Sequence, residues 1–123
     1  VRVLIPERPD HLLVFLSAFA FLPEMIRNGV KIYRYQPGFL HQKVLLVDDH
    51  TSMVGTVNLD NRSFRLNFEV TAYIPDKIFA AAVFDMLEKD FANSRQVSQR
   101  ELAERPLWRK LLSRATYLLS PVQ

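Results

Sequence analysis

A histidine, a lysine and an asparagine fall within eighteen residues of each other, at His41, Lys43 and Asn58. Together they supply what attack on a phosphodiester needs. The imidazole attacks phosphorus or moves a proton, the ammonium neutralises a phosphate oxygen, and the amide donates a hydrogen bond. Because His41 and Lys43 are two residues apart, they point to the same side of an extended strand. We interpret this segment as a candidate phosphoryl-transfer site.

The same segment resembles a known motif. Its residues follow the HxK(x)4D(x)6G(S/T)xN pattern of the phospholipase D superfamily, in the order His41, Lys43, Asp48, Gly55, Thr56 and Asn58. The wider segments 37–43 and 56–69 are similar to the second, C-terminal motif region of bacterial cardiolipin synthases. The similarity extends to residues 33–37 before the motif and 105–108 near the end.

The resemblance implies an active site built from two HxK motifs, of which this sequence contains one. The second half-domain is expected from the same full-length chain or from a dimer mate. The implied reaction transfers a phosphatidyl group between two phosphatidylglycerol molecules through a phosphohistidine, with no cofactor. In that reaction one histidine attacks phosphorus and the other protonates the departing glycerol. His41, in the second motif, is expected to act as acid and then as base.

The remaining motif residues have more than one interpretation. Lys43 and Asn58 are expected to hold phosphate oxygens, whereas Asp48 either takes part in catalysis or bonds backbone amides in a turn. Gly55 lets the backbone approach a ligand or bend sharply. Thr56 offers its hydroxyl to the phosphate or to a neighbouring histidine.

Two charged residues follow the motif. Glu69 is expected to accept the second ring N–H of His41, as an acidic residue does in this superfamily, although it could be an ordinary carboxylate at a strand end. Arg62, in an expected loop, could bind lipid phosphate or pair with Asp60 or Glu69. His11 and His50 have no partner at metal-ligand spacing, so no metal site is predicted.

Hydrophobic periodicity predicts the elements that position the motif. Strands are expected over 1–5, 30–35, 43–47, 52–57 and 68–74, and helices over 10–28 and 76–95. This order predicts an α/β fold with a mixed sheet flanked by helices, which in the resembling family is a phospholipase D-like half-domain. The apolar run 43–47 places the motif strand at the sheet centre. One face of the second helix is predicted to be apolar, with Ile78, Phe79, Ala82, Val83, Met86, Leu87 and Phe91.

Residues 1–97 are expected to form the catalytic half-domain and 98–123 a basic amphipathic helical extension. Its apolar face contains Leu107, Trp108, Leu111, Leu112, Ala115, Leu118 and Leu119, with Arg109, Lys110 and Arg114 on other faces. Such a helix either lies on an anionic membrane or packs against its own protein.

Composition limits the remaining alternatives. The chain has 123 residues, 49% of them hydrophobic, no cysteine and a net charge of +3, which fits one domain and mildly favours anionic partners such as phosphatidylglycerol. Its longest apolar stretch is shorter than the roughly 18 residues of a transmembrane helix. The opening without methionine suggests a fragment. By resemblance, the expected location is the bacterial cytoplasmic membrane.

Two other functions remain open. The chain could belong to another enzyme of the superfamily, a phospholipase or a dimeric nuclease, or it could be an inactive truncated interaction domain. The scarcity of basic clusters around the motif argues against nucleic acid as a partner.

Overall fold

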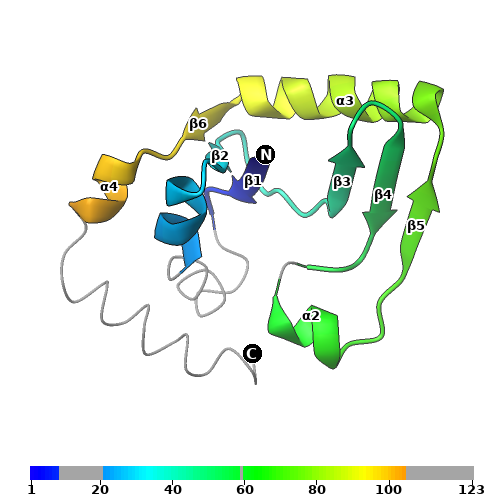
Figure 1. The fold of residues 1–123 in the computed structure, drawn as a ribbon, viewed down its shortest axis with the longest axis horizontal. Coiled ribbons are helices and arrows are strands. Elements are labelled where there is room, and N and C mark those ends of the chain that lie inside the picture. Colours follow the sequence, from blue (N-terminus) through cyan, green and yellow to red (C-terminus); the bar gives the residue numbers. More distant parts are fainter. Residues whose placement is uncertain (9–20, 59, 105–123) are drawn as a thin grey trace.

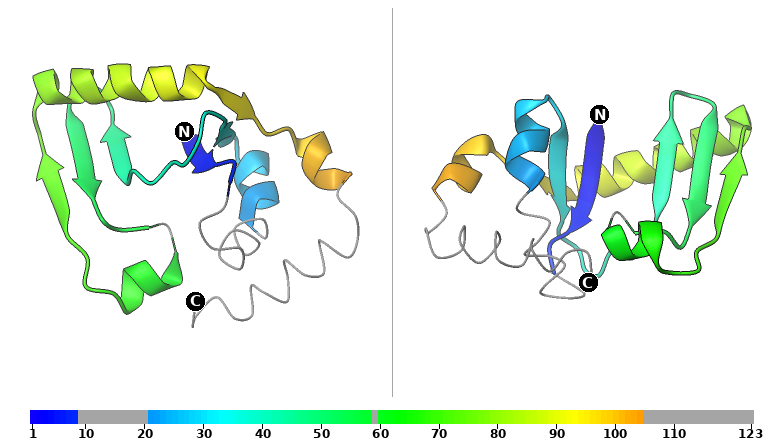
Figure 2. Two further views of the ribbon diagram at one scale, coloured as in Figure 1. Left: turned by 180° about the vertical axis from the view of Figure 1, so that it is seen from behind. Right: turned by 60° about the horizontal axis from the view of Figure 1, so that its bottom comes forward.

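The computed structural model describes residues 1–8, 21–58 and 60–104, with the backbone alone described at Asn61, Arg62 and Ala103. Within these ranges two three-stranded sheets lie side by side, and one long helix, α3 (Lys77–Ala92), runs past both (Figure 1). Strands of both sheets contact α3, and the views from behind and from below show the same arrangement (Figure 2). The predicted α/β class, with mixed pairing and flanking helices, is confirmed, but the strands form two sheets where one was expected.

The first sheet contains β1 (Arg2–Pro6), β2 (Lys31–Tyr35) and β6 (Ser94–Gln96). β1 pairs with β2 in parallel, and β6 pairs with β2 antiparallel. Before β2, a helical segment over 21–27 ends at Gly29, whose φ of 82° allows the N–H groups of Gly29 and Val30 to bond back to Ile26 and Met25. The predicted stop at Gly29 is confirmed, whereas the predicted start of this helix lies outside the described residues.

The core lies against this first sheet. Its buried members are Leu22, Ile32, Val97 and Leu102. Leu102 belongs to α4 (Gln99–Ala103), a short helix whose first turn is capped by the Ser98 hydroxyl, which accepts from the Glu101 N–H. The beginning of the C-terminal region therefore packs on the half-domain.

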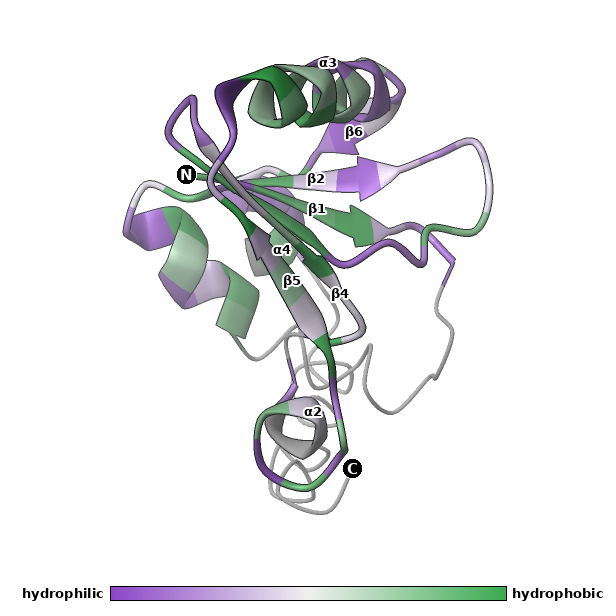
Figure 3. Ribbon diagram, turned by 90° about the vertical axis from the view of Figure 1, so that its right-hand side faces the viewer, coloured by the Kyte–Doolittle hydropathy of each residue, from purple (hydrophilic) through white to green (hydrophobic). Residues whose placement is uncertain are grey.

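The second sheet is antiparallel and contains β3 (Val44–Val47), β4 (Thr51–Gly55) and β5 (Thr71–Ile74). The strand order is β3-β4-β5, so the prediction that the motif strand is central is wrong within the described residues. Leu45 and Val47 of β3 remain 52% and 42% exposed. A short apolar run is typical of a strand but does not indicate how many neighbours the strand has. Figure 3, coloured by hydropathy, shows hydrophobic segments in β4 and β5 below α3.

α3 begins where the sequence predicts but ends earlier than predicted. It begins after Asp76, whose carboxylate accepts the Phe79 N–H at 2.7 Å, and stops at Ala92, because residues 94–96 pair with β2 as β6. The predicted apolar face is only partly covered, since Val83 is buried but Ile78 is 84% exposed. In Figure 1 the helix crosses β3 to β5 near one end of these strands.

Candidate active site

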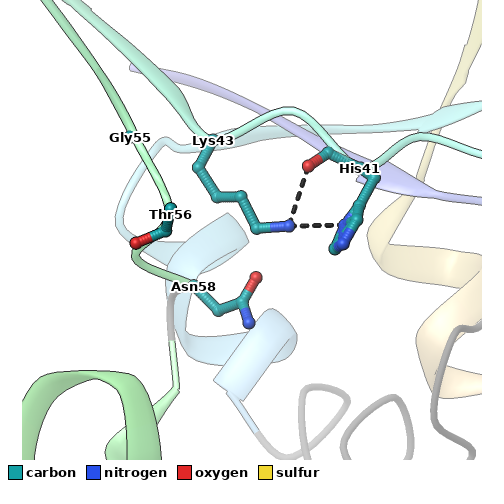
Figure 4. Close-up of a pocket in the computed structure, with 5 residues that line it drawn as sticks. All are labelled: His41, Lys43, Gly55, Thr56 and Asn58. Carbon is teal, nitrogen blue, oxygen red and sulfur yellow. Dashed lines mark hydrogen bonds between the residues drawn. The ribbon is translucent and has the colours of Figure 1, made fainter. Parts of the chain in front are cut away.

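The β3–β4 hairpin brings the predicted residues together at its open end. His41 and Lys43 lie on the extended segment that leads into β3, and the Gly55 N–H donates to the Lys43 carbonyl at 3.1 Å, so the two arms are joined there. Five predicted residues line one pocket of about 260 Å³, namely His41, Lys43, Gly55, Thr56 and Asn58 (Figure 4).

His41 and Lys43 are in direct contact, as the two-residue spacing indicates. Lys43 Nζ donates to His41 Nδ1 at 2.6 Å and to the His41 carbonyl at 2.7 Å (Figure 4). An ammonium group has no lone pair to offer, so Nδ1 must carry the lone pair and the ring proton must lie on Nε2. The Phe39 ring flanks the imidazole, with centroids 5.4 Å apart. Nε2 is therefore the ring nitrogen that Lys43 leaves free to exchange a proton with a ligand.

Glu69 makes its hydrogen bonds with residues other than His41. Its carboxylate accepts the Thr56 hydroxyl and, at 3.3 Å, the amide of Asn67. The Thr56 hydrogen bond foremost, followed by those of Ser63 and Asn67 and by the charge of Lys43, lowers the pKa of Glu69. The expected orienting bond from Glu69 to His41 is thus replaced by a bond that holds the end of β4.

The Thr56 hydroxyl takes part in the same hydrogen-bond network. Its hydroxyl oxygen accepts the Val70 N–H at 3.0 Å and its proton goes to Glu69, so the hydroxyl is offered neither to a phosphate nor to a histidine, the two roles that the sequence suggests. In Figure 4 the hydroxyl points away from His41 and Lys43. Thr56 lines the pocket but serves to fasten β4 to the segment that precedes β5.

Close packing of β5 against β4, rather than close approach of a ligand, accounts for the glycine at position 55. It pairs with Thr71 of β5, and a Cβ at this position would lie 2.7 Å from the Thr71 Cα and in collision with the Val70 carbonyl. Any larger residue would push β5 away from β4. The glycine therefore keeps the hairpin closed beside the pocket.

Asp48 lies at the other end of the hairpin. It sits in the turn between β3 and β4 with a φ of +49°, a left-handed conformation that Asp tolerates better than most residues. Because a strand rises about 3.3 Å per residue, the four residues of β3 put roughly 13 Å between this turn and the pocket. Asp48 supports the turn, and its assignment as a catalytic residue is not supported.

The remaining predicted residues are less constrained. Asn58 is exposed and lines the pocket next to Lys43 (Figure 4). Arg62 falls in a short helix, α2 (Asn61–Arg65), where a loop was expected. The Arg62 side chain is outside the described atoms, so its phosphate-binding role stays a prediction. Asp60 caps this helix, since its Oδ1 accepts the Ser63 N–H at 2.7 Å.

One contact near the pocket was not expected from the sequence. The Gln42 amide, between His41 and Lys43, donates to the Asp90 carboxylate of α3 at 2.6 Å. Alternation along an extended segment turns Gln42 away from the pocket, but no local pattern in the sequence indicates Asp90 as its partner.

Two other features are absent from the part of the chain that the structure describes. No group of three histidine, aspartate or glutamate side chains there lies close enough to hold a metal ion. No helix in the same ranges has the length and apolar character needed to span a bilayer.

Comparison with known proteins agrees with this geometry. The sequence profile of the family described as "Cardiolipin synthase, PLD-like domain" matches residues 1–94. Among curated proteins, the chain is 49% identical over 122 residues to cardiolipin synthase A of Pseudomonas entomophila (strain L48), covering 99% of the chain and 26% of that protein. It is 50% identical to cardiolipin synthase A of Pseudomonas putida, with 99% and 25% covered. For the Pseudomonas fluorescens (strain SBW25) protein the identity is 48%, with 99% and 26% covered.

The fold and pocket define a phospholipase D-like half-domain with one HxK motif. The chain belongs to the cardiolipin synthase family of such domains. It spans about a quarter of the length of the curated relatives it matches.

Proposed function

We propose that this chain supplies one half of an active site that transfers a phosphatidyl group between two phosphatidylglycerol molecules, giving cardiolipin and glycerol. The observation that carries the proposal is the convergence of His41, Lys43 and Asn58 on one pocket. The naming of its relatives as cardiolipin synthase A supports the choice of lipid.

The chemistry needs two imidazoles. In the first step a histidine of the second HxK half attacks phosphorus, the bond from phosphorus to the glycerol oxygen breaks, and His41 gives that oxygen a proton. In the second step a hydroxyl of another phosphatidylglycerol attacks the phosphohistidine and His41 takes its proton. The phosphorus–nitrogen bond breaks and the first histidine is restored.

Lys43 links substrate binding to the protonation of His41 in this scheme. In the free pocket Lys43 Nζ donates to Nδ1, which keeps Nδ1 unprotonated. A bound phosphate offers the ammonium a stronger, anionic acceptor. Once Lys43 turns to the phosphate, Nδ1 can take a proton from water, and the resulting imidazolium gives its Nε2 proton to the departing glycerol oxygen.

The partners and the location follow from the same proposal. The second HxK half would come from the remainder of a longer chain or from a dimer mate, and the substrate would be presented by the cytoplasmic membrane of a bacterium. We assign 1–97 to the catalytic half-domain and 98–123 to the extension, whose amphipathic helix over 105–123 lies outside the described residues and is proposed to contact anionic lipid. Each cation there would add about 1 kcal/mol on an anionic surface.

The extension is tested by sedimentation with phosphatidylglycerol vesicles. The full chain should bind more strongly than a version ending at Glu104, which keeps Leu102 in the core. The difference should shrink as salt is raised, because salt screens the attraction to the headgroups. Equal binding by the two versions would show that the helix packs only against its own protein.

The function itself is tested by product analysis. The full-length protein, given phosphatidylglycerol vesicles, should release one glycerol for each cardiolipin formed. Release of phosphatidic acid instead would assign a phospholipase, and cleavage of nucleic acid a nuclease. The transfer proposal fails if the product is phosphatidic acid or cleaved nucleic acid, or if no reaction occurs.

A further inference from the structure

We infer that Asp90 of α3 is a positioning residue for the HxK pair and acts through Gln42, an inference that rests on the proposed function of His41 and Lys43. The Gln42 Nε2 atom donates to Asp90 Oδ2 at 2.6 Å. Gln42 stands between the two pocket residues, so its side chain leaves the extended segment on the side opposite to theirs. Two consecutive residues therefore face opposite sides: His41 faces the pocket, and Gln42 is hydrogen-bonded to α3.

The segment that bears His41 has few other anchors. Its approach is fixed where the Gln36 N–H donates to the Asn93 carbonyl at 3.3 Å, and its exit where the Gly55 N–H donates to the Lys43 carbonyl at 3.1 Å. Between these points the described structure gives residues 37–42 no backbone–backbone hydrogen bond. The Gln42–Asp90 bond thus holds the stretch against the helix one residue away from His41.

α3 is a firm reference for this bond. Asp76 caps its first turn, and Phe91 packs edge to face on Tyr33 of β2 with ring centroids 4.9 Å apart. A hydrogen bond to a carboxylate is also about twice as strong as one between neutral groups. Asp90 therefore holds Gln42, and with it the neighbouring His41, at a fixed position relative to α3.

The consequence for catalysis is geometric. A reacting group displaced by about 1 Å can lose on the order of 100-fold in rate, whereas binding of the distant parts of the substrate is unaffected. Asp90→Ala and Gln42→Ala in the full-length enzyme should each lower kcat by about 10-fold or more, with KM near the wild-type value. Because both changes break the same bond, the double variant should be no worse than either single one.

Two controls separate positioning from general support of the fold. Asp90→Asn keeps an oxygen that accepts from Gln42 and should recover most of the lost kcat. Glu88→Ala removes a tie from the same helix to β1, away from the motif, and should leave kcat near wild type. A loss in Glu88→Ala equal to that in Asp90→Ala, or losses that add in the double variant, would overturn the inference.

A spectroscopic readout does not depend on turnover. In the ¹⁵N-histidine-labelled chain, the His41 ring should show the Nε2–H tautomer that the Lys43 contact imposes, with its signals assigned by their absence in His41→Ala. Asp90→Ala should move these signals toward a mixture of tautomers, while Glu88→Ala should not. Unchanged His41 signals in Asp90→Ala would overturn the positioning role, even in a protein that makes cardiolipin. If the enzyme makes no cardiolipin, the proposed function fails and the ring signals still decide the role of Asp90.

Discussion

His41→Ala in the full-length protein is expected to abolish cardiolipin formation. In the proposed reaction the imidazole donates a proton to the departing glycerol oxygen and then accepts one from the attacking hydroxyl. Loss of such a group costs about 10²- to 10⁴-fold in rate. The ring is exposed at the pocket, and its removal leaves no buried cavity, so the fold should be kept. Turnover and thermal unfolding of the variant, measured side by side, check both statements.

The matched control is His50→Ala. His50 is also exposed, but it lies in the turn at the far end of the hairpin, where Nδ1 is 2.6 Å from the Thr51 hydroxyl. This variant should keep nearly wild-type turnover. Wild-type turnover in His41→Ala would end the assignment of His41 as the acid and base.

Lys43→Met should have the second largest effect. Methionine keeps the length of the side chain but removes the charge that neutralises a phosphate oxygen and the donor that fixes Nδ1 of His41. Loss of a single preorganised donor at a site of developing charge costs about 10²- to 10³-fold in kcat. Lys43→Arg should recover only part of the kcat that is lost in Lys43→Met. The planar guanidinium keeps the positive charge, but its N–H donors do not reach the position that the lysine ammonium occupies.

The comparison for Lys43 is Lys77→Met. Lys77 is an exposed lysine at the first position of α3, away from the pocket, and its removal should leave turnover unchanged. If Lys43→Met were as active as Lys77→Met, the phosphate-binding role of Lys43 would be wrong.

The sequence predicted best those features that depend on neighbouring residues. The stop at Gly29 needs only a residue that adopts positive φ, and the start of α3 needs only the Asp76 side chain and an N–H three residues on. The placement of His41 and Lys43 on the same side of the chain follows from a two-residue spacing on an extended segment, and in the structure Lys43 Nζ lies 2.6 Å from His41 Nδ1. Such features require no knowledge of the rest of the fold.

Features set by distant partners could not be predicted in this way. β6 exists because residues 94–96 find β2, some sixty positions earlier, and so α3 ends before the predicted residue 95. Glu69 was assigned to His41 from the family pattern, but pairing of β4 with the segment before β5 places it against Thr56. The bond from Gln42 to Asp90 joins residues 48 positions apart, which no local pattern indicates.

The central claim, that this chain holds half of a two-histidine site, is tested most directly by activity of the chain alone against its concentration. Turnover of phosphatidylglycerol vesicles is measured over a range of protein concentrations, together with the molar mass from light scattering. One imidazole cannot serve as nucleophile and as acid in the same step. We expect no turnover from the monomer, and any activity should rise with the dimer fraction. Turnover proportional to concentration in a sample that stays monomeric would contradict the half-site account.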